Sequence, residues 1–260
     1  IQHEAVHAID GWDDLRRRLQ PDRRCFAFFH PQLPDEPLIF VEVALVPDMA
    51  DAIAPLINKK SAPRPPEDFK VAVFYSISNC QPGLRGVSLG NFLIKRVAEQ
   101  LKRELPQLKT FCTLSPIPGL SSWLMKAREG TALAGLPQPA TERAVHAMAQ
   151  LRESAGDDLA ALNQATTLAA LPTAARHALW RLAALYLVHL SPTPQGDPVA
   201  RFHLDNGARL ERLNACANLA SKGLKQSAGL MVNYLYDLGR IETCHARFVK
   251  GRVVHSRDIS

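Results

Sequence analysis

The chain has 260 residues, of which 47% are hydrophobic and 22% charged, proportions typical of a soluble globular protein with one substantial core or two small ones. It contains no run of eighteen apolar residues, which excludes a membrane-spanning helix. Its formal net charge of +6 suggests an anionic partner. Because the basic residues are scattered among acidic ones, nucleic acid is not indicated, and a polyphosphate ligand would suffice.

The first 24 residues open with His3-Glu4-Ala5-Val6-His7, a literal match to the zinc-protease helix motif. In that motif, two histidines on one helix face hold the metal and the glutamate acts as a base. Here Asp10-Gly11 would break a helix within one turn of His7, and no third ligand follows at a metzincin spacing. A chance match is the favoured interpretation, and we predict no metal site.

The next segments predict a helix, a hairpin and a loop. Residues 12–19 predict a short helix whose arginines form a solvent-exposed face. Residues 25–30 and 38–46 are typical of two strands, joined into a hairpin by a loop with three prolines. A short helix is expected within 47–58, and the proline-rich residues 59–68 are the best candidate for a flexible loop.

A strand, a glycine-containing loop, a helix and a second strand follow. Residues 71–78 form a short apolar run rich in β-branched and aromatic side chains, which predicts a central strand. Apolar residues recur at helical spacing from Leu89 to Leu105, and Pro106 ends that helix. Residues 110–114 predict the next strand, and Ser115 leaves its end.

The loop before this helix has the composition of an anion-binding device. Gly86 and Gly90 would let the backbone approach a phosphate, and the helix N-terminus would point free N–H groups at it. Arg85 would add a mobile cation. Taken alone, the loop is equally an ordinary βα turn, since it matches neither a Walker loop nor a complete dinucleotide fingerprint.

Beyond Gly119 the sequence is mainly helical. Four helices are expected, over residues 121–128, 141–152, 157–171 and 173–190. Residues 199–204 are expected to be extended, and Asp205-Asn206-Gly207 to form a turn that leads into a helix through Leu219. Residues 230–236 predict a final strand, and the last twenty residues a basic, partly mobile tail.

The five cysteines are odd in number and show no paired spacing: Cys25, Cys80, Cys112, Cys216 and Cys244. This favours free thiols in a reducing compartment over a disulfide framework or a zinc site. The sequence begins at Ile1, so it is expected to be a fragment or a trimmed product. With no signal-like segment and no Ser-Lys-Leu ending, a cytoplasmic location is expected.

Two polar residues stand where chemistry is plausible. Ser115 leaves the end of a predicted central strand, where α/β sheets place ligands, and Pro116 and Pro118 stiffen the segment that presents it. His203 precedes a tight turn. From the residues alone, a turn serine and a packed structural histidine explain both positions.

Several blocks of the sequence resemble known families. Residues 85–90 resemble the pyrophosphate loop of GNAT acetyltransferase folds, with Ser88 in place of the first glycine. Five blocks, in order along the chain, resemble malonyl-CoA decarboxylase: 74–78, 90–97, 114–119, 202–208 and 229–234. The resemblance implies an α/β (α+β) fold with a GNAT-like mixed central β-sheet flanked by helices. One catalytic domain would cover 1–260, with a helical insert at about 121–190.

The resemblance also implies the site residues. It maps the catalytic serine and histidine onto Ser115 and His203, and a third active-site position onto Tyr236, with Tyr234 as the alternative in register. The implied coenzyme A-binding residues are Ser76, Ile77, Ser78, Gln81, Gly83, Arg85, Gly86, Val87, Ser88, Leu89 and Gly90. Family members can carry glutamate where this chain has Ser88, and a serine cannot give the same charge-assisted bond to an imidazole.

The implied reaction converts malonyl-CoA to acetyl-CoA and carbon dioxide through an enolate stabilised by the Ser/His pair, and it requires neither metal nor cofactor. The alternatives are a CoA-dependent N-acyltransferase of the same fold and a non-catalytic CoA-sensing module. The family usually carries a helical domain before this point. We expect the full-length protein to form a homo-oligomer through that domain, with neither nucleic acid nor membrane as a partner.

Overall fold

The computed structural model describes residues 9, 11–81, 83, 90–131, 133–157 and 159–259. The chain divides into two compact units. Unit 1 comprises the chain up to Ser115 together with Leu235–Gly239, and unit 2 comprises Pro116–Tyr234 and Arg240–Ser260. Across the described residues, no helix combines the length and the apolarity that crossing a bilayer requires.

Unit 1 is built on a mixed sheet. Its main strands are β1 (Arg23–His30), β2 (Leu33–Val46), β3 (Val71–Asn79) and β4 (Thr110–Thr113). β1 and β2 form an antiparallel hairpin, β2 pairs antiparallel with β3, and β3 pairs parallel with β4. The centre of the sheet is fully buried, as at Val41, Val43 and Val73. The predicted mixed sheet is therefore confirmed.

The predicted hairpin is confirmed, but its second strand begins earlier than expected, at Leu33. Pro34 and Pro37 lie within β2 and not in a connecting loop. Opposite them, the pairing with β1 shifts register between Phe28 and His30. A proline has no N–H to give to the ladder, so an irregular, exposed part of a strand is where it is tolerated.

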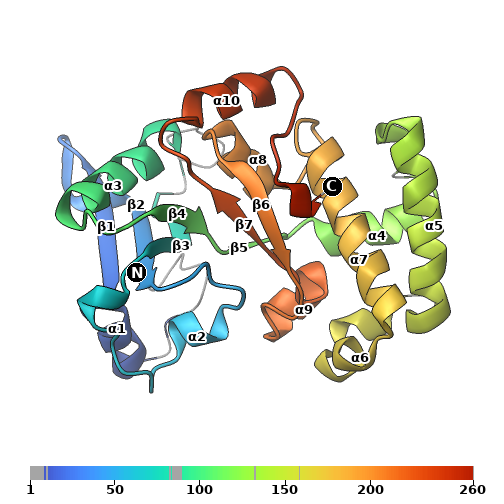
Figure 1. Ribbon diagram of the computed structural model, residues 1–260, viewed down its shortest axis with the longest axis horizontal. Coiled ribbons are helices and arrows are strands. Elements are labelled where there is room, and N and C mark those ends of the chain that lie inside the picture. The colour runs from blue at the N-terminus through green and yellow to red at the C-terminus, as the bar shows by residue number, and fades with distance from the viewer. Residues whose placement is uncertain are drawn as a thin grey trace. The chain divides into compact units, whose positions relative to one another are not determined.

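The helical segments described in unit 1 are α1 (Trp12–Arg18), α2 (Ala54–Ile57), the 3₁₀-helix η1 (Pro66–Asp68) and α3 (Gly90–Glu104). α3 joins β3 to β4, because two parallel strands cannot be connected by a tight turn. It buries a stripe that includes Val97, Ala98 and Leu101. Figure 1 shows α3 beside β1, and Phe26 of β1 and Arg96 of α3 line a common pocket.

Two of the three arginines of α1 are buried and do not form the solvent-exposed face that the sequence predicted; only Arg16 is exposed. Arg17 and Arg18 are 3% and 2% exposed. Arg17 forms a two-pronged ion pair with Asp22, at 2.6 and 3.0 Å. The helix buries its charged side because carboxylates on α1 and on the hairpin neutralise it.

We call this group of buried charges the ion cluster; its members are Asp14, Arg17, Arg18, Asp22, Arg23 and Glu42. The Nε of Arg18 lies 2.9 Å from Asp14 Oδ1, and its Nη1 lies 2.9 Å from Glu42 Oε2 on β2. Arg23 contacts Asp22 at 3.0 Å and donates to the carbonyl of Leu56. The ion cluster thus fastens both α1 and α2 to the hairpin.

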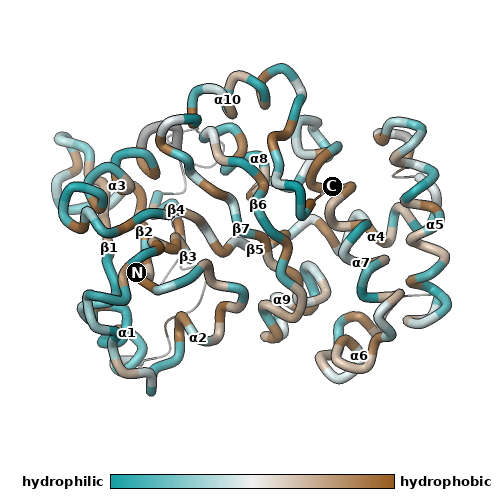
Figure 2. Tube along the Cα trace, viewed as in Figure 1, coloured by the Kyte–Doolittle hydropathy of each residue, from teal (hydrophilic) through white to brown (hydrophobic). Residues whose placement is uncertain are grey.

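Unit 2 begins with a helical region formed by α4 (Leu120–Arg128), α5 (Gln138–Ala155), α6 (Ala165–Ala170) and α7 (Thr173–Leu185), with short 3₁₀ turns η3 (Leu133–Gly135) and η4 (Ala160–Asn163). α5 and α7 lie side by side (Figure 1). Both bury alanines, among them Ala144, Ala147 and Ala178. Hydrophobic and hydrophilic residues alternate along both helices (Figure 2), as expected of helices that bury one side.

The predicted helices at 121–128 and 141–152 are confirmed as α4 and α5. The predicted single helix at 157–171 is wrong, because extended backbone at Gln164 separates η4 from α6. The helix predicted over 173–190 changes to a π-helix, η5 (Tyr186–Leu190), for its last five residues. Single π-turns of this kind are frequent at functional sites.

The rest of unit 2 contains α8 (Pro198–Asp205), β6 (Arg209–Asn214), α9 (Ser221–Ser227), β7 (Met231–Leu235), α10 (Ile241–Val249) and the 3₁₀-helix η6 (Arg257–Ile259). β6 pairs with β7. Leu235, which ends β7 and belongs to unit 1, pairs antiparallel with Cys112 of β4. The predicted final strand is confirmed, as is the turn at Gly207, where φ is +78°.

Three other predictions for this part of the chain are wrong. Residues 199–204 are helical, because Asp197 caps α8 and Pro198 occupies its first turn. The segment after Gly207 is the strand β6 and not a helix. The C-terminal tail is ordered: α10 buries Ile241 and Phe248, and His255 forms a bridge to Leu210.

The ion cluster generates a test of stability. Arg18→Ala would leave the carboxylates of Asp14 and Glu42 buried without their cation, so we expect the free energy of unfolding to fall by about 3 kcal/mol. Arg16→Ala, in the same helix at an exposed position, is the matched control and should cost under about 0.5 kcal/mol. Urea titration measures both. Equal losses would show that the ion cluster does not hold α1.

Candidate active site

Ser115 lies where β4 ends, in the two-residue strand β5 (Ser115–Pro116). Its side chain is 5% exposed, and its Oγ donates to Thr113 Oγ1 at 2.9 Å. The N–H of Leu114 donates to the carbonyl of Phe74, which ties this segment to β3. Because residues two apart in a strand share a face, Thr113 can orient the Ser115 hydroxyl. The sequence prediction did not include Thr113.

Tyr236 belongs to unit 1 and follows β7. Its backbone N–H donates to the carbonyl of Phe111 at 2.8 Å, and its ring meets the edge of Phe74 with centroids 6.4 Å apart. The side chain is 2% exposed, and burial raises the pKa of the phenol well above its usual value. The phenol is therefore neutral at physiological pH and keeps the proton that a hydrogen-bond donor needs.

His203 belongs to unit 2 and lies near the end of α8. Its ring is 4% exposed and stacks on Tyr234, with centroids 4.7 Å apart and planes 25° apart. Phe202 meets it edge-on at 5.0 Å. Burial lowers the pKa of His203 to about 3, so the imidazole is neutral near neutral pH. A neutral ring offers one N–H donor and one nitrogen acceptor.

The predicted catalytic residues are thus placed by different elements. Ser115 and Tyr236 belong to unit 1, whereas His203 and the alternative tyrosine, Tyr234, belong to unit 2. The structure brings Tyr234 and His203 together within unit 2. The joint action of Ser115 and His203 stays a prediction.

The predicted coenzyme A-binding residues are described only in part. Ser76, Ile77 and Ser78 form the end of β3, where both serines are buried. Gln81 donates from its amide to Glu36 at 3.1 Å, and Gly83 is exposed. Gly90 is the first residue of α3. Five of the predicted residues lie outside the described part of the chain: Arg85, Gly86, Val87, Ser88 and Leu89.

The strand β3 precedes the predicted phosphate loop and the helix α3 follows it, while the phosphate cradle itself stays a prediction. The His3–His7 motif also falls on residues that the structure does not describe. Among the residues that it does describe, no three His, Cys, Asp or Glu side chains are grouped so that they could hold a metal ion.

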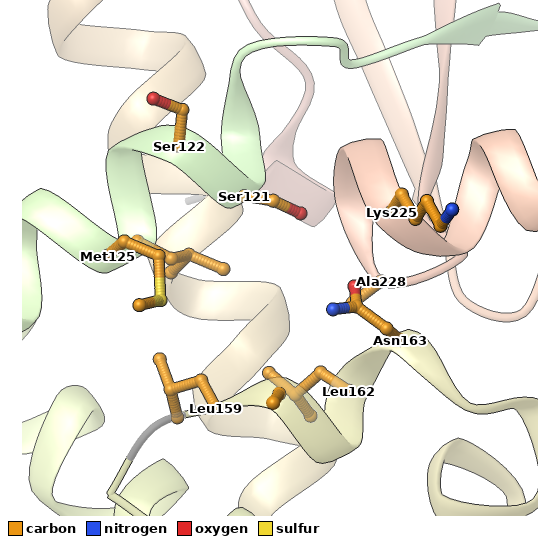
Figure 3. Close-up of a pocket in the computed structure, with 10 residues that line it drawn as sticks. Ser121, Ser122, Met125, Leu159, Leu162, Asn163, Lys225 and Ala228 are labelled. Atoms are coloured by element: carbon orange, nitrogen blue, oxygen red, sulfur yellow. The ribbon is translucent and has the colours of Figure 1, made fainter.

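Unit 2 contains a separate pocket of about 320 Å³, lined by residues of α4, η4 and the end of α9 (Figure 3). Met125, Leu159 and Leu162 supply apolar walls, while Ser121 and Lys225 supply polar groups. Its lining residues include none of the predicted site residues. They are spread from Ser121 to Ala228 without a common motif, so no local pattern predicts the pocket.

Comparison with known proteins agrees with the resemblance in the sequence. The family model for the malonyl-CoA decarboxylase C-terminal domain matches residues 1–260. Mitochondrial malonyl-CoA decarboxylase of Anser anser anser is 38% identical over 243 residues, covering 90% of this chain and 48% of that protein. The corresponding protein of Mus musculus is 38% identical over 258 residues, covering 90% and 49%.

The crystal structure of malonyl-CoA decarboxylase from Rhodopseudomonas palustris is similar, with a TM-score of 0.81 and 46% identity over 100% of this chain and 61% of that one. The structure from Cupriavidus metallidurans gives a TM-score of 0.77 and 46% identity over 96% of this chain and 61% of that one. The chain spans about half the length of the curated relatives it matches.

The depressed pKa of His203 predicts a pH dependence of stability. Below pH 6.5 the unfolded chain gains a proton on this histidine that the folded chain does not bind until about pH 3. The contribution of His203 to the free energy of unfolding is therefore fully present above pH 6.5. It is lost as the pH falls, by about 1 kcal/mol per pH unit. His203→Asn should flatten the decline in unfolding free energy between pH 6.5 and 4.

The matched control is His177→Asn, at an exposed histidine of α7. In this variant the unfolding free energy should fall with pH as steeply as in the unmodified chain, because His203 is still present. If His203→Asn and His177→Asn lose stability with pH at the same rate, the folded chain does not hold the His203 ring neutral by burial.

Proposed function

The chain belongs to the family of malonyl-CoA decarboxylase C-terminal domains, and from this membership we propose that it carries the site that converts malonyl-CoA into acetyl-CoA and carbon dioxide. The observation that carries the proposal is the match of the whole chain to this family. The buried, neutral groups at Ser115, His203 and Tyr236 support it, because decarboxylation needs polar groups with defined directions in a site that excludes water.

The reaction breaks the bond between the carboxylate carbon and the α-carbon of the malonyl group. The electron pair of that bond passes into the thioester, carbon dioxide leaves, and an enolate remains with most of its negative charge on the thioester oxygen. A hydroxyl donor aimed at that oxygen lowers the barrier, typically by roughly 3 kcal/mol. We assign this role to Ser115, whose hydroxyl would turn its proton from Thr113 to the thioester oxygen when the substrate binds.

His203 would work from its neutral form. The imidazole can accept from a hydroxyl with one nitrogen and donate with the other. When the enolate forms, the nearby negative charge favours the protonated ring and raises its pKa, so the ring can then carry a proton to the α-carbon. Tyr236, neutral and buried, would donate to the substrate carboxylate or to the histidine.

Coenzyme A would be held by the end of β3 and the beginning of α3. The first turn of α3, a fifteen-residue helix, offers backbone N–H groups and a partial positive charge to the pyrophosphate. Pantetheine would run beside Ser76 and Ser78. Self-association of the full-length protein, through the helical domain that this family usually carries, belongs to the same proposal.

The direct test is to incubate the protein with malonyl-CoA and follow the release of carbon dioxide and the appearance of acetyl-CoA. Turnover without an acceptor supports the decarboxylase. Transfer that requires an amine would instead support an N-acyltransferase, and binding of coenzyme A without turnover would support a sensing module. In heavy water, deuterium should enter the acetyl methyl group, because the new proton comes from water through the site.

Two substitutions test the assignment of the residues. Ser115→Ala should lower kcat about a hundredfold with little change in KM, because it removes a donor that matters most to the developing charge. His203→Asn should also cripple turnover, since an amide cannot take up and return a proton near neutral pH. If the two side chains act as one unit, the double variant should be scarcely worse than the poorer single one.

Ser122→Ala, at an exposed serine of α4, is the matched control and should leave kcat unchanged. Near-normal decarboxylation by His203→Asn would falsify the role given to that residue. A loss in KM alone for Ser115→Ala would move Ser115 from stabilising the enolate to binding the substrate.

A further inference from the structure

Asp197 is an almost fully buried carboxylate that sequence reasoning did not single out. It is 1% exposed. Its Oδ1 accepts from the backbone N–H groups of Val199 and Ala200, at 2.9 and 3.0 Å, and so caps the N-terminus of α8. Its Oδ2 accepts from the N–H of Gly119 at 2.8 Å. All of these groups belong to unit 2, and one carboxylate joins the beginnings of α8 and α4.

One of the two elements that Asp197 joins carries a proposed catalytic residue, His203. α8 begins beside Asp197 and carries His203 in its last turn, so the position of its first turn sets where the ring lies. The other is the start of α4, where Pro118 directly precedes Gly119 and restricts the backbone. Neither connection requires Asp197 to touch a substrate.

The surroundings of Asp197 are built to hold it in one place. It follows the π-helix η5 and a tight turn, in which a side chain at Gly196 would collide with the backbone of Leu190 and lie 2.7 Å from the Cα of Ser191. The N–H of Gly196 donates to the carbonyl of Thr193 at 3.0 Å. Glycine is therefore required immediately before Asp197.

A second close approach surrounds the bond to Gly119. A side chain at Gly119 would collide with the hydroxyl of Tyr186 and lie 3.2 Å from Asp197 Oδ2. Tyr186 is itself fixed, since its ring stacks on Trp123 of α4 with centroids 5.1 Å apart. The bond from Gly119 to Asp197 thus lies in a packed environment, where a lost or misdirected hydrogen bond shifts the backbone.

We propose that Asp197 is a positioning residue, whose carboxylate fixes the first turn of α8 against Gly119 so that His203 is presented in the geometry that the reaction needs. The inference rests on the proposed function. It assigns no chemistry to Asp197, which acts only through the backbone groups of Val199, Ala200 and Gly119. A shift of about 1 Å in a positioned group can cost about a hundredfold in rate.

Asp197→Asn separates the helix cap of α8 from the hydrogen bond to Gly119. Asparagine caps a helix as well as aspartate does, so the side-chain oxygen can keep the N–H groups of α8. Its NH₂ group then faces the N–H of Gly119, donor against donor. We expect kcat to fall about tenfold or more while KM for malonyl-CoA changes less than about threefold, in a protein whose circular dichroism and melting temperature remain close to those of the unmodified chain.

Asp197→Ser is a second variant that also keeps a helix cap and cannot reach Gly119, so it tests the proposal even if Asp197→Asn fails to fold. Asp157→Asn is the matched control: the same substitution at an exposed carboxylate of unit 2 that pairs with Arg152 should leave kcat unchanged. If a folded Asp197 variant keeps its kcat, or loses only KM, Asp197 is merely a helix cap and the proposal is overturned.

A readout independent of turnover distinguishes failure of this inference from failure of the proposed function. In protein labelled with ¹⁵N-histidine, the ring signals of His203, assigned by their loss in His203→Asn, should move in Asp197→Asn and stay unchanged in Asp157→Asn. If the unmodified protein releases no carbon dioxide, the decarboxylase proposal fails, and these signals still decide whether Asp197 positions the ring. Unmoved signals would overturn the inference in either case.

Discussion

The parallel pairing of β3 and β4 is the constraint on which the candidate site in unit 1 depends. Two parallel strands cannot be joined by a turn, and α3 lies between β3 and β4 in the chain. As a consequence, the beginning of α3 and the segment that starts at Ser115 both follow the carboxyl ends of neighbouring strands. Parallel sheets bind ligands at this edge, where an anion-attracting helix N-terminus and reactive side chains meet.

Burial gives the proposed catalytic groups their protonation states. His203 and Tyr236 are both kept neutral by loss of solvent, which favours hydrogen bonding over ionic attraction as their mode of action. The cost of burying polar groups is offset locally in each unit. In unit 1 the ion cluster balances three cations with three carboxylates, and in unit 2 three backbone N–H groups surround the carboxylate of Asp197.

The sequence could predict elements whose local signals agree with their tertiary surroundings. The β-branched run predicted the strand β3, the apolar stripe predicted the helix α3, and the apolar residues 230–236 predicted the strand β7. The role predicted for His203 came from the family resemblance and not from periodicity. The local sequence around His203 indicates only a packed histidine. The protonation state of that ring depends on burial by residues distant in sequence, which no local pattern contains.

The wrong predictions can each be traced to a physical cause. Asp197 followed by Pro198 is a helix-start signal. It stands near several other prolines, which favour the extended segment predicted for 199–204 over the observed helix. The helix predicted after Gly207 is wrong because β6 pairs with β7. This interaction joins segments separated by α9, so the local sequence does not contain it. The arginines of α1 were assigned to the surface because their acidic partners include Glu42, on another element.

The ion cluster has a further consequence, for the redox chemistry of the chain. Cys25 lies on β1 beside it, with its thiol directed at the carbonyl of Arg18. Burial, together with the negative charge of Glu42, raises the pKa of this thiol to about 11. Oxidants and alkylating agents react with thiolates, so burial protects Cys25, while Glu42 and Arg18 of the ion cluster act on the pKa of its thiol in opposite directions. Cys216 is an exposed thiol in a turn of unit 2 that oxidants reach directly, so the two positions would age differently in air.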